Sequence, residues 1–186
     1  MAKKHFILGG SNSGKSRFAE QTALDIKKKF SGDLYYIATG LAYYKEMKKK
    51  IAKHKSERNP KFKTIDSPDL RTDILQNCTP NDIILVDCIS ISLSNILTIK
   101  EFSGRQIEDI ESNIENCKSH LIIVGQETSM GIIPPNALSR RFLKVSGNFN
   151  QFLTPMYWSS SANNFSSSLS KNGFIFSLFG LPIYIM

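Results

Sequence analysis

The chain has 186 residues, of which 41% are apolar and 22% are charged, and its formal net charge is +8. This composition is typical of a globular protein and excludes a disordered or fibrous one, and no apolar run approaches the roughly 20 residues that a membrane-spanning helix needs. We therefore expect residues 1–186 to form a single domain. The three cysteines form no C-x-x-C pair, which predicts neither a disulfide framework nor a thiolate metal site and favours a reducing, cytoplasmic compartment.

Short apolar runs alternate with helix-like segments along most of the chain. Strands are predicted at residues 5–8, 33–38, 62–65, 83–86 and 121–124, and the runs at 83–86 and 121–124 are continuously apolar. Helices are predicted from apolar spacing and capping signals at residues 16–29, 45–58, 68–76, 89–99, 106–117 and 136–153, the last interrupted near Gly147. This alternation predicts an α/β fold with a mainly parallel sheet flanked by helices.

The last part of the chain has a different composition. Residues 159–170 read SSSANNFSSSLS, a serine-rich segment without charge that is typical of a loop. Strand composition returns at residues 174–179 and 181–185.

A glycine-rich segment separates the first predicted strand from the first predicted helix. It fits G-x-x-x-x-G-K-[ST], and this phosphate loop consists of Gly9, Gly10, Ser11, Asn12, Ser13, Gly14, Lys15 and Ser16. Motif and context together favour a P-loop NTPase-like nucleotide site over an ordinary glycine turn. Backbone N–H groups and the helix N-terminus would bind phosphate, Lys15 would reach the β- and γ-phosphates, and the Ser16 hydroxyl would ligate Mg²⁺.

Asp87 directly follows the predicted strand at residues 83–86. The carboxyl end of a buried strand is where ligands bind in open α/β sheets, and a carboxylate there organises the metal of a phosphate loop. We therefore predict Asp87 as the second Mg²⁺ ligand. The alternative is that Asp87 caps the following helix.

Residues 45–58 hold seven Lys or Arg against two Glu, so five of the eight net positive charges lie in one predicted helix. Lys50, His54 and Arg58 follow at i, i+4 and i+8, on one face. A neutral imidazole there would be a nucleophile, and its cationic neighbours would hold the phosphates under attack. The alternative is a solvated charged face with an incidental histidine. Nucleic-acid binding is not expected, since no aromatic residues interleave the cations and no reader motif is present.

The order of these segments resembles the bifunctional adenosylcobinamide kinase/adenosylcobinamide-phosphate guanylyltransferase family of cobalamin biosynthesis. The likeness runs from about residue 5 to residue 152. Beyond the phosphate loop it includes Y-I-A-T at 36–39, I-x-x-H-K-x-x-R at 51–58, L-V-D-C at 85–88 and M-G-I-I-P at 130–134. A phosphate loop alone does not identify a substrate. Its combination with the segments at 51–58 and 130–134 is much more specific for this family.

The resemblance implies two reactions. A nucleoside triphosphate, GTP or ATP, phosphorylates the aminopropanol hydroxyl of adenosylcobinamide in the presence of Mg²⁺. GTP separately donates GMP to a histidine that falls on His54, and this GMP passes to adenosylcobinamide phosphate to give adenosylcobinamide-GDP. Lys15 and His54 are then the expected catalytic residues, and Lys50, Arg58 and Glu127 join the phosphate loop in binding nucleotide. The family also suggests a ring-like homo-oligomer such as a trimer.

The sequence departs from the family pattern at several positions. Asn12 replaces a usual arginine, Gln126 replaces a usual asparagine, and Leu143-Lys144 replaces a usual Arg-Asp pair. The likeness fails after Gln151 and returns at residues 179–182, so we expect residues 153–173 to be a divergent loop or insertion. Two alternative functions are a P-loop kinase of another small alcohol, in which His54 does not react, and a GTP-binding family member that has lost turnover.

Overall fold

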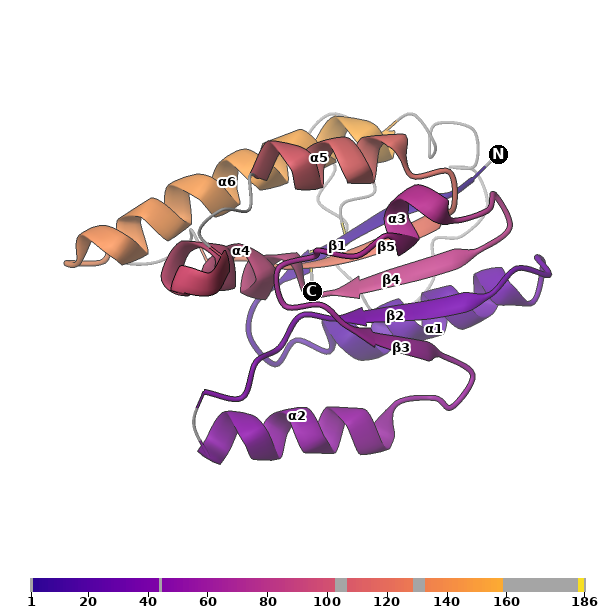
Figure 1. Ribbon diagram of the computed structural model, residues 1–186, viewed down its shortest axis with the longest axis horizontal. Helices are drawn as coiled ribbons and strands as arrows, with labels where there is room; N and C mark the ends of the chain where they lie inside the picture. Colours follow the sequence, from indigo (N-terminus) through magenta and orange to yellow (C-terminus); the bar gives the residue numbers. More distant parts are fainter. Residues whose placement is uncertain (1, 44, 103–106, 129–132, 159–183, 186) are drawn as a thin grey trace.

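The computed structural model describes residues 2–43, 45–102, 107–128, 133–158 and 184–185. Within these ranges six strands form one sheet in the order β3-β2-β4-β5-β1-β6, and every neighbouring pair is parallel (Figure 1). The strands are β1 (Lys4–Gly9), β2 (Leu34–Ala38), β3 (Lys63–Asp66), β4 (Ile83–Asp87), β5 (His120–Gln126) and β6 (Tyr184–Ile185). The first five overlap the strands predicted from the sequence. The predicted α/β class with a parallel sheet is confirmed.

Helices cover both faces of the sheet (Figure 1). One face packs against α1 (Lys15–Lys27). The other is covered by α3 (Ile74–Asn77), α4 (Ile89–Thr98), the 3₁₀ turn η1 (Lys100–Phe102), α5 (Ile107–Asn116) and α6 (Ala137–Trp158). The central strands β4 and β5 are largely apolar because both of their faces are buried. In β4, for example, Ile84 and Val86 join the core under α4–α6, whereas Ile83 and Leu85 join the core under α1.

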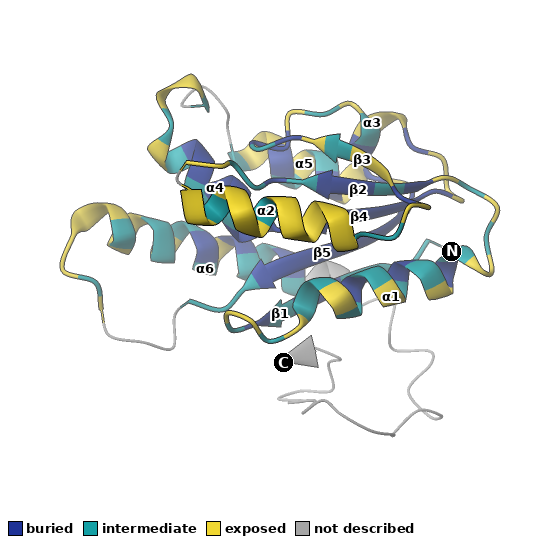
Figure 2. Cartoon of the chain, turned by 90° about the horizontal axis from the view of Figure 1, so that it is seen from below, coloured by how far each residue is buried: buried dark blue, intermediate teal, exposed yellow. Residues whose placement is uncertain are grey.

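The basic helix α2 (Lys45–Glu57) belongs to neither core. None of its 13 residues is buried. It lies beyond β3, outside the two layers of helices (Figure 1), and most of its surface is exposed (Figure 2). Burial of an apolar face therefore does not fix the position of α2, which must depend on contacts made by individual side chains.

The helix predicted over residues 68–76 is wrong for most of its length. Only Ile74–Asn77 is helical. The preceding residues form a turn in which the Leu70 N–H donates to the Ser67 carbonyl at 3.2 Å and Leu70 has φ 56°. A residue whose backbone is in the left-handed region cannot continue a right-handed helix. The Leu70 side chain is fully buried, so its packing stabilises a turn that local propensity does not predict.

The interruption predicted near Gly147 is also wrong, since α6 passes through this residue and continues to Trp158. Phe149 packs into the core beside Phe142, Val145 and Phe152, and this spacing keeps one face of the helix buried across the glycine. The first six residues of the loop predicted at 153–173 are therefore helical. Although α6 is the longest helix described, neither it nor any other helix in the described part of the chain is long and apolar enough to cross a membrane.

The rest of the predicted loop, residues 159–173, and the strand predicted at 174–179 lie outside the described residues. Of the strand predicted at 181–185, the described residues are Tyr184–Ile185. They form β6, which pairs in parallel with Ile7 and Leu8 of β1.

Substitution of two glycines by alanine tests how closely the chain packs around each position. A Cβ at Gly147 would have no atom within 4 Å, so Gly147→Ala should raise the free energy of unfolding by about 0.5–1 kcal/mol through higher helix propensity. A Cβ at Gly32, between α1 and β2, would lie 2.1 Å from the backbone oxygen of Asn81. Gly32→Ala should therefore lower the free energy of unfolding by about 1–3 kcal/mol or more. Urea unfolding measures both, and a destabilising Gly147→Ala would contradict the continuous helix.

Candidate functional site

A cleft of about 420 Å³ opens at the carboxyl ends of the strands. Its walls come from the phosphate loop, the ends of β2, β3 and β4, and one side of α2. Most of the residues singled out in the sequence line it, namely Ser11, Asn12, Ser13, Gly14, Lys15, Ser16, Lys50, His54, Arg58 and Asp87. Three predicted residues, Gly9, Gly10 and Glu127, do not line the cleft but lie beside it. Gly9 ends β1, and its carbonyl accepts the Glu127 N–H at 3.0 Å.

The phosphate loop turns sharply into α1. Gly14 has φ +86° and directly precedes the helix, and Asn12 has φ 57°. Asparagine tolerates this left-handed conformation better than most residues do, so Asn12 suits the loop although the family usually has arginine there. No side chain caps the N-terminus of α1, which leaves its first N–H groups available to an anion.

Lys15 folds back onto the phosphate loop. Its ammonium group donates to the Gly10 carbonyl and lies 3.4 Å from the Ser13 hydroxyl oxygen. Partial burial lowers the pKa of Lys15, and the charge of Lys50 lowers it further, while Cys88 and Asp87 act in the opposite direction. The side chains of the phosphate loop, β4 and α2 therefore already interact electrostatically across the cleft.

Two carboxylates end the strands on either side of β2 at the cleft. Asp87 is the last residue of β4 and Asp66 the last residue of β3, and both are paired in register with Ala38 of β2. The Tyr36 hydroxyl donates to Oδ2 of Asp87 at 2.5 Å. Asp66 was not predicted as a site residue, although it directly follows the strand predicted at residues 62–65, as Asp87 follows the strand predicted at residues 83–86.

The oxygen donors at this edge of the sheet suit a hard cation. The Ser16 hydroxyl and the Asp87 carboxylate both face the cleft. Among the described residues there is no cluster of three or more His, Cys, Asp or Glu side chains that would enclose a metal. Mg²⁺ needs no such cluster, because it is commonly held by one or two protein oxygens together with phosphate oxygens and water.

One side of α2 faces the cleft along its length. The lining residues that the helix contributes are Met47, Lys50, Ile51, His54 and Lys55, and Arg58 follows directly after it. The predicted stripe of Lys50, His54 and Arg58 therefore faces the phosphate loop across the cleft. Ile51 packs close to Gly40, where a Cβ would lie 3.4 Å from its Cδ1.

Arg58 fixes the carboxyl end of α2 to the sheet. The central carbon of its guanidinium lies 3.5 Å from the centroid of the Tyr36 ring, and Nη1 donates to the Thr64 hydroxyl at 3.0 Å. Glu20 of α1 also faces this group. Burial raises the pKa of Glu20, while Arg58 and a hydrogen bond from the Asn59 backbone lower it. Neither Tyr36 nor Glu20 was predicted as a site residue, because their contacts arise only when α1, β2 and α2 come together.

A buried polar network holds the rim of the cleft. The Thr39 hydroxyl donates to the Cys88 carbonyl at 2.8 Å and accepts the Cys88 N–H at 2.9 Å. The Asn95 amide donates to the carbonyls of Thr39 and Pro68, both at 2.9 Å, and accepts from the Tyr43 hydroxyl at 3.1 Å. Burial raises the pKa of Cys88 to about 12, so this residue remains a thiol and acts as a small core side chain.

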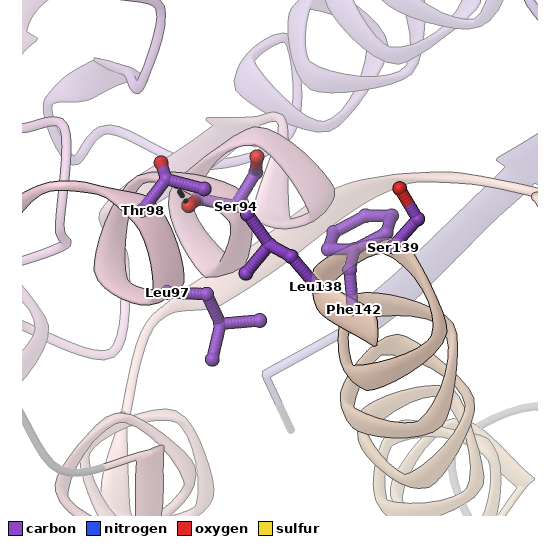
Figure 3. A pocket seen from close by; sticks show the side chains of 6 residues that line it. All are labelled: Ser94, Leu97, Thr98, Leu138, Ser139 and Phe142. Carbon is purple, nitrogen blue, oxygen red and sulfur yellow. Dashed lines mark hydrogen bonds between the residues drawn. The ribbon is translucent and has the colours of Figure 1, made fainter. Parts of the chain in front are cut away.

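A smaller hollow of about 160 Å³ lies between α4 and α6 (Figure 3). The six residues that line it are Ser94, Leu97, Thr98, Leu138, Ser139 and Phe142. Its polar groups are hydroxyls, and the Thr98 hydroxyl already donates to the Ser94 carbonyl at 2.7 Å. It offers no charged side chain for phosphate, so the chemistry points to the larger cleft.

Comparisons of the sequence with known proteins identify a family. The sequence model of a family described as cobinamide kinase / cobinamide phosphate guanyltransferase matches residues 5–159. The bifunctional adenosylcobalamin biosynthesis protein CobP of Pseudomonas aeruginosa is 31% identical over 153 residues, which cover 80% of this chain and 85% of that protein. The CobU proteins of Salmonella typhimurium and Escherichia coli K12, which carry the same description, are 29% and 26% identical over 163 residues. Each of these matches covers 79% of this chain and 87% of the relative.

The rim network predicts a specific loss of stability. Asn95→Ala leaves the buried carbonyls of Thr39 and Pro68 without their donors, so it should lower the free energy of unfolding by about 2–3 kcal/mol. Tyr43→Phe removes only the hydroxyl of a largely exposed ring and should lower it by less than about 1 kcal/mol. Urea unfolding curves of the two variants give the free energies of unfolding. Equal losses of this free energy would contradict the conclusion that Asn95 holds the network together.

Proposed function

This chain belongs to the cobinamide kinase / cobinamide phosphate guanyltransferase family, and from that premise we propose how its cleft carries out the two reactions. It is a bifunctional transferase of cobalamin biosynthesis. In the proposal a nucleoside triphosphate phosphorylates adenosylcobinamide, and GMP from GTP passes through His54 to adenosylcobinamide phosphate, giving adenosylcobinamide-GDP. The observation that carries the proposal is that the phosphate loop, Asp87 and His54 line one cleft.

In the kinase step the phosphate loop and the free N–H groups of α1 bind the triphosphate. The Lys15 ammonium exchanges its contact with the Gly10 carbonyl for the β- and γ-phosphate oxygens. Ser16 and Asp87 would hold Mg²⁺, which would neutralise charge on the phosphates. The chain thus acts by positioning the γ-phosphoryl group. The substrate hydroxyl oxygen bonds to the γ-phosphorus, the bond from that phosphorus to the β,γ-bridging oxygen breaks, and the nucleoside diphosphate and the hydroxyl proton leave.

In the guanylyl step a neutral imidazole nitrogen of His54 attacks the α-phosphorus of GTP. An N–P bond forms, the bond from the α-phosphorus to the bridging oxygen breaks, and pyrophosphate leaves. A phosphate oxygen of adenosylcobinamide phosphate then attacks the same phosphorus and releases His54. Lys50 and Arg58 stabilise the charge that develops on the α-phosphate.

Several further assignments belong to the same proposal. We infer that Gly9, Gly10 and Glu127 contribute to nucleotide binding from beside the cleft, supported by the hydrogen bond that joins Glu127 to the end of β1. The single sheet and its two cores support one domain. A ring-like homo-oligomer and a cytoplasmic location remain predictions from the family resemblance and the cysteine content.

Loss of Lys15 should remove kinase turnover without unfolding the protein. Lys15→Ala deletes the charge that neutralises the transferred phosphate, so turnover of adenosylcobinamide should fall about 100-fold or more. Lys28→Ala is the matched control, because Lys28 is an exposed lysine of the turn after α1 that pairs with Asp25 and does not line the cleft. Near-normal turnover in folded Lys15→Ala protein would refute the assignment of Lys15.

Loss of His54 should separate the two reactions. After incubation with GTP and Mg²⁺, intact-mass measurement should show one GMP on the wild-type chain and none on His54→Asn, since asparagine has no nucleophilic nitrogen. Kinase turnover should change far less, because Lys15, Ser16 and Asp87 remain. Lys53→Ala is the control within α2, since Lys53 pairs with Glu57 and does not line the cleft.

Two outcomes would count against the histidine mechanism. A GMP adduct that persists in His54→Asn would place the nucleophile elsewhere. Equal loss of both activities in a folded His54→Asn protein would mean that His54 serves a common binding step. A wild-type chain that phosphorylates another small alcohol without ever forming the adduct would favour the simpler kinase.

A further inference from the structure

Tyr36 joins the basic helix to the carboxylate that ends β4. Its side chain is almost completely buried, with 2% of its surface exposed. Its hydroxyl donates to Oδ2 of Asp87 at 2.5 Å, and the guanidinium of Arg58 stacks on its ring at 3.5 Å. One buried residue therefore contacts both the predicted metal ligand and the end of the helix that carries His54.

The surroundings of the Tyr36 ring hold it in a single orientation. Phe62 meets the ring edge-on, with the ring centroids 5.7 Å apart and the planes at 88°. Arg58 is itself held over the ring by the Thr64 hydroxyl, and Thr64 lies next to Tyr36 in the register of β2 and β3. A ring packed by an aromatic neighbour and a guanidinium cannot swing its hydroxyl away without losing these contacts.

The Asp87 carboxylate needs such a constraint. It lies at the end of a strand and is only partly buried, so packing alone leaves its side chain free to rotate. A hydrogen bond from tyrosine to a carboxylate is charge-assisted and strongly directional. Because the bond takes Oδ2, the other oxygen remains for a ligand, and among the described residues no hydrogen bond to Oδ1 is present.

We propose that Tyr36 is a positioning residue of the kinase site: its hydroxyl orients the Asp87 carboxylate for the metal–nucleotide complex, while Arg58 and Phe62 fix the ring. This inference rests on the proposed role of Asp87 as a metal ligand. It assigns Tyr36 a function through Asp87 and no contact with the reacting atoms.

The test measures metal affinity directly. Mn²⁺ serves as a paramagnetic probe, and its binding to the full chain in the presence of a non-hydrolysable GTP analogue is titrated by electron paramagnetic resonance. Tyr36→Phe keeps the ring and removes only the hydroxyl, so the dissociation constant for Mn²⁺ should rise about 10- to 100-fold. Thermal unfolding, measured in parallel, should stay close to that of the wild type.

The neighbouring residue supplies a matched control. The Tyr35 hydroxyl donates to Oδ2 of Asp33 at 3.2 Å, near the other end of the same strand and outside the cleft. Tyr35→Phe also removes a tyrosine–aspartate hydrogen bond, and it should leave the Mn²⁺ affinity within about twofold of the wild-type value. A fold-wide effect of losing a tyrosine hydroxyl would change both variants alike and would overturn the proposal.

Asp87→Asn separates this inference from the proposed function. If Tyr36 acts through Asp87, then Tyr36→Phe has no further effect in the Asp87→Asn background, whereas an independent role would give additive losses and overturn the proposal. Wild-type affinity in Tyr36→Phe, with weak binding in Asp87→Asn, would overturn the positioning role alone. Wild-type affinity in Asp87→Asn would overturn the metal assignment and this inference together.

A structure of the wild-type chain with Mg²⁺ and the same analogue tests the proposal even if Tyr36→Phe does not fold. The expected result is a Tyr36 hydroxyl still bonded to one Asp87 oxygen, with the other oxygen turned to the metal or to a metal-bound water. A Tyr36 hydroxyl that has left Asp87 in this complex would overturn the proposal.

Discussion

The burial of both faces of one parallel sheet is the constraint on which the rest of the molecule depends. With α1 on one side and α4–α6 on the other, the central strands β4 and β5 expose neither face, and their side chains are used for packing. Functional groups can then project only from the ends of the strands. In a parallel sheet the carboxyl ends lie at the same edge. Gly9, Asp66 and Asp87 therefore all lie along this edge although they are far apart in the chain.

The same constraint explains what could be predicted from the sequence. Short strand-like segments marked five strands, and the residues that follow the first and the fourth of them gave the phosphate loop and Asp87, because strand, turn and helix signals there are local. The stripe of Lys50, His54 and Arg58 was visible as helix spacing. No local signal in the sequence excluded the alternative that this stripe is only a solvated helix face. The resemblance to a known family was needed to choose between the two interpretations.

The features that sequence reasoning missed depend on contacts between distant segments. The turn at Leu70 is stabilised by burial of its side chain, and the helix across Gly147 by the aromatic residues around it. Tyr36 reads as an ordinary strand residue, although its ring lies between Phe62 and Arg58. Asp66 is the exception, since its position directly after a predicted strand was visible and was not used.

The absence of buried residues in α2 has a consequence for local stability. Opening this helix would expose little apolar surface beyond the partly buried Met47 and Ile51, and its lysines repel one another, so its local unfolding free energy should lie below that of the two cores. A bound triphosphate would stabilise the folded helix. Its negative charge offsets the repulsion between the lysines, and a ligand that binds only the folded state shifts the equilibrium toward that state. In the proposed mechanism, the helix that carries His54 should therefore become more stable as the concentration of the triphosphate rises.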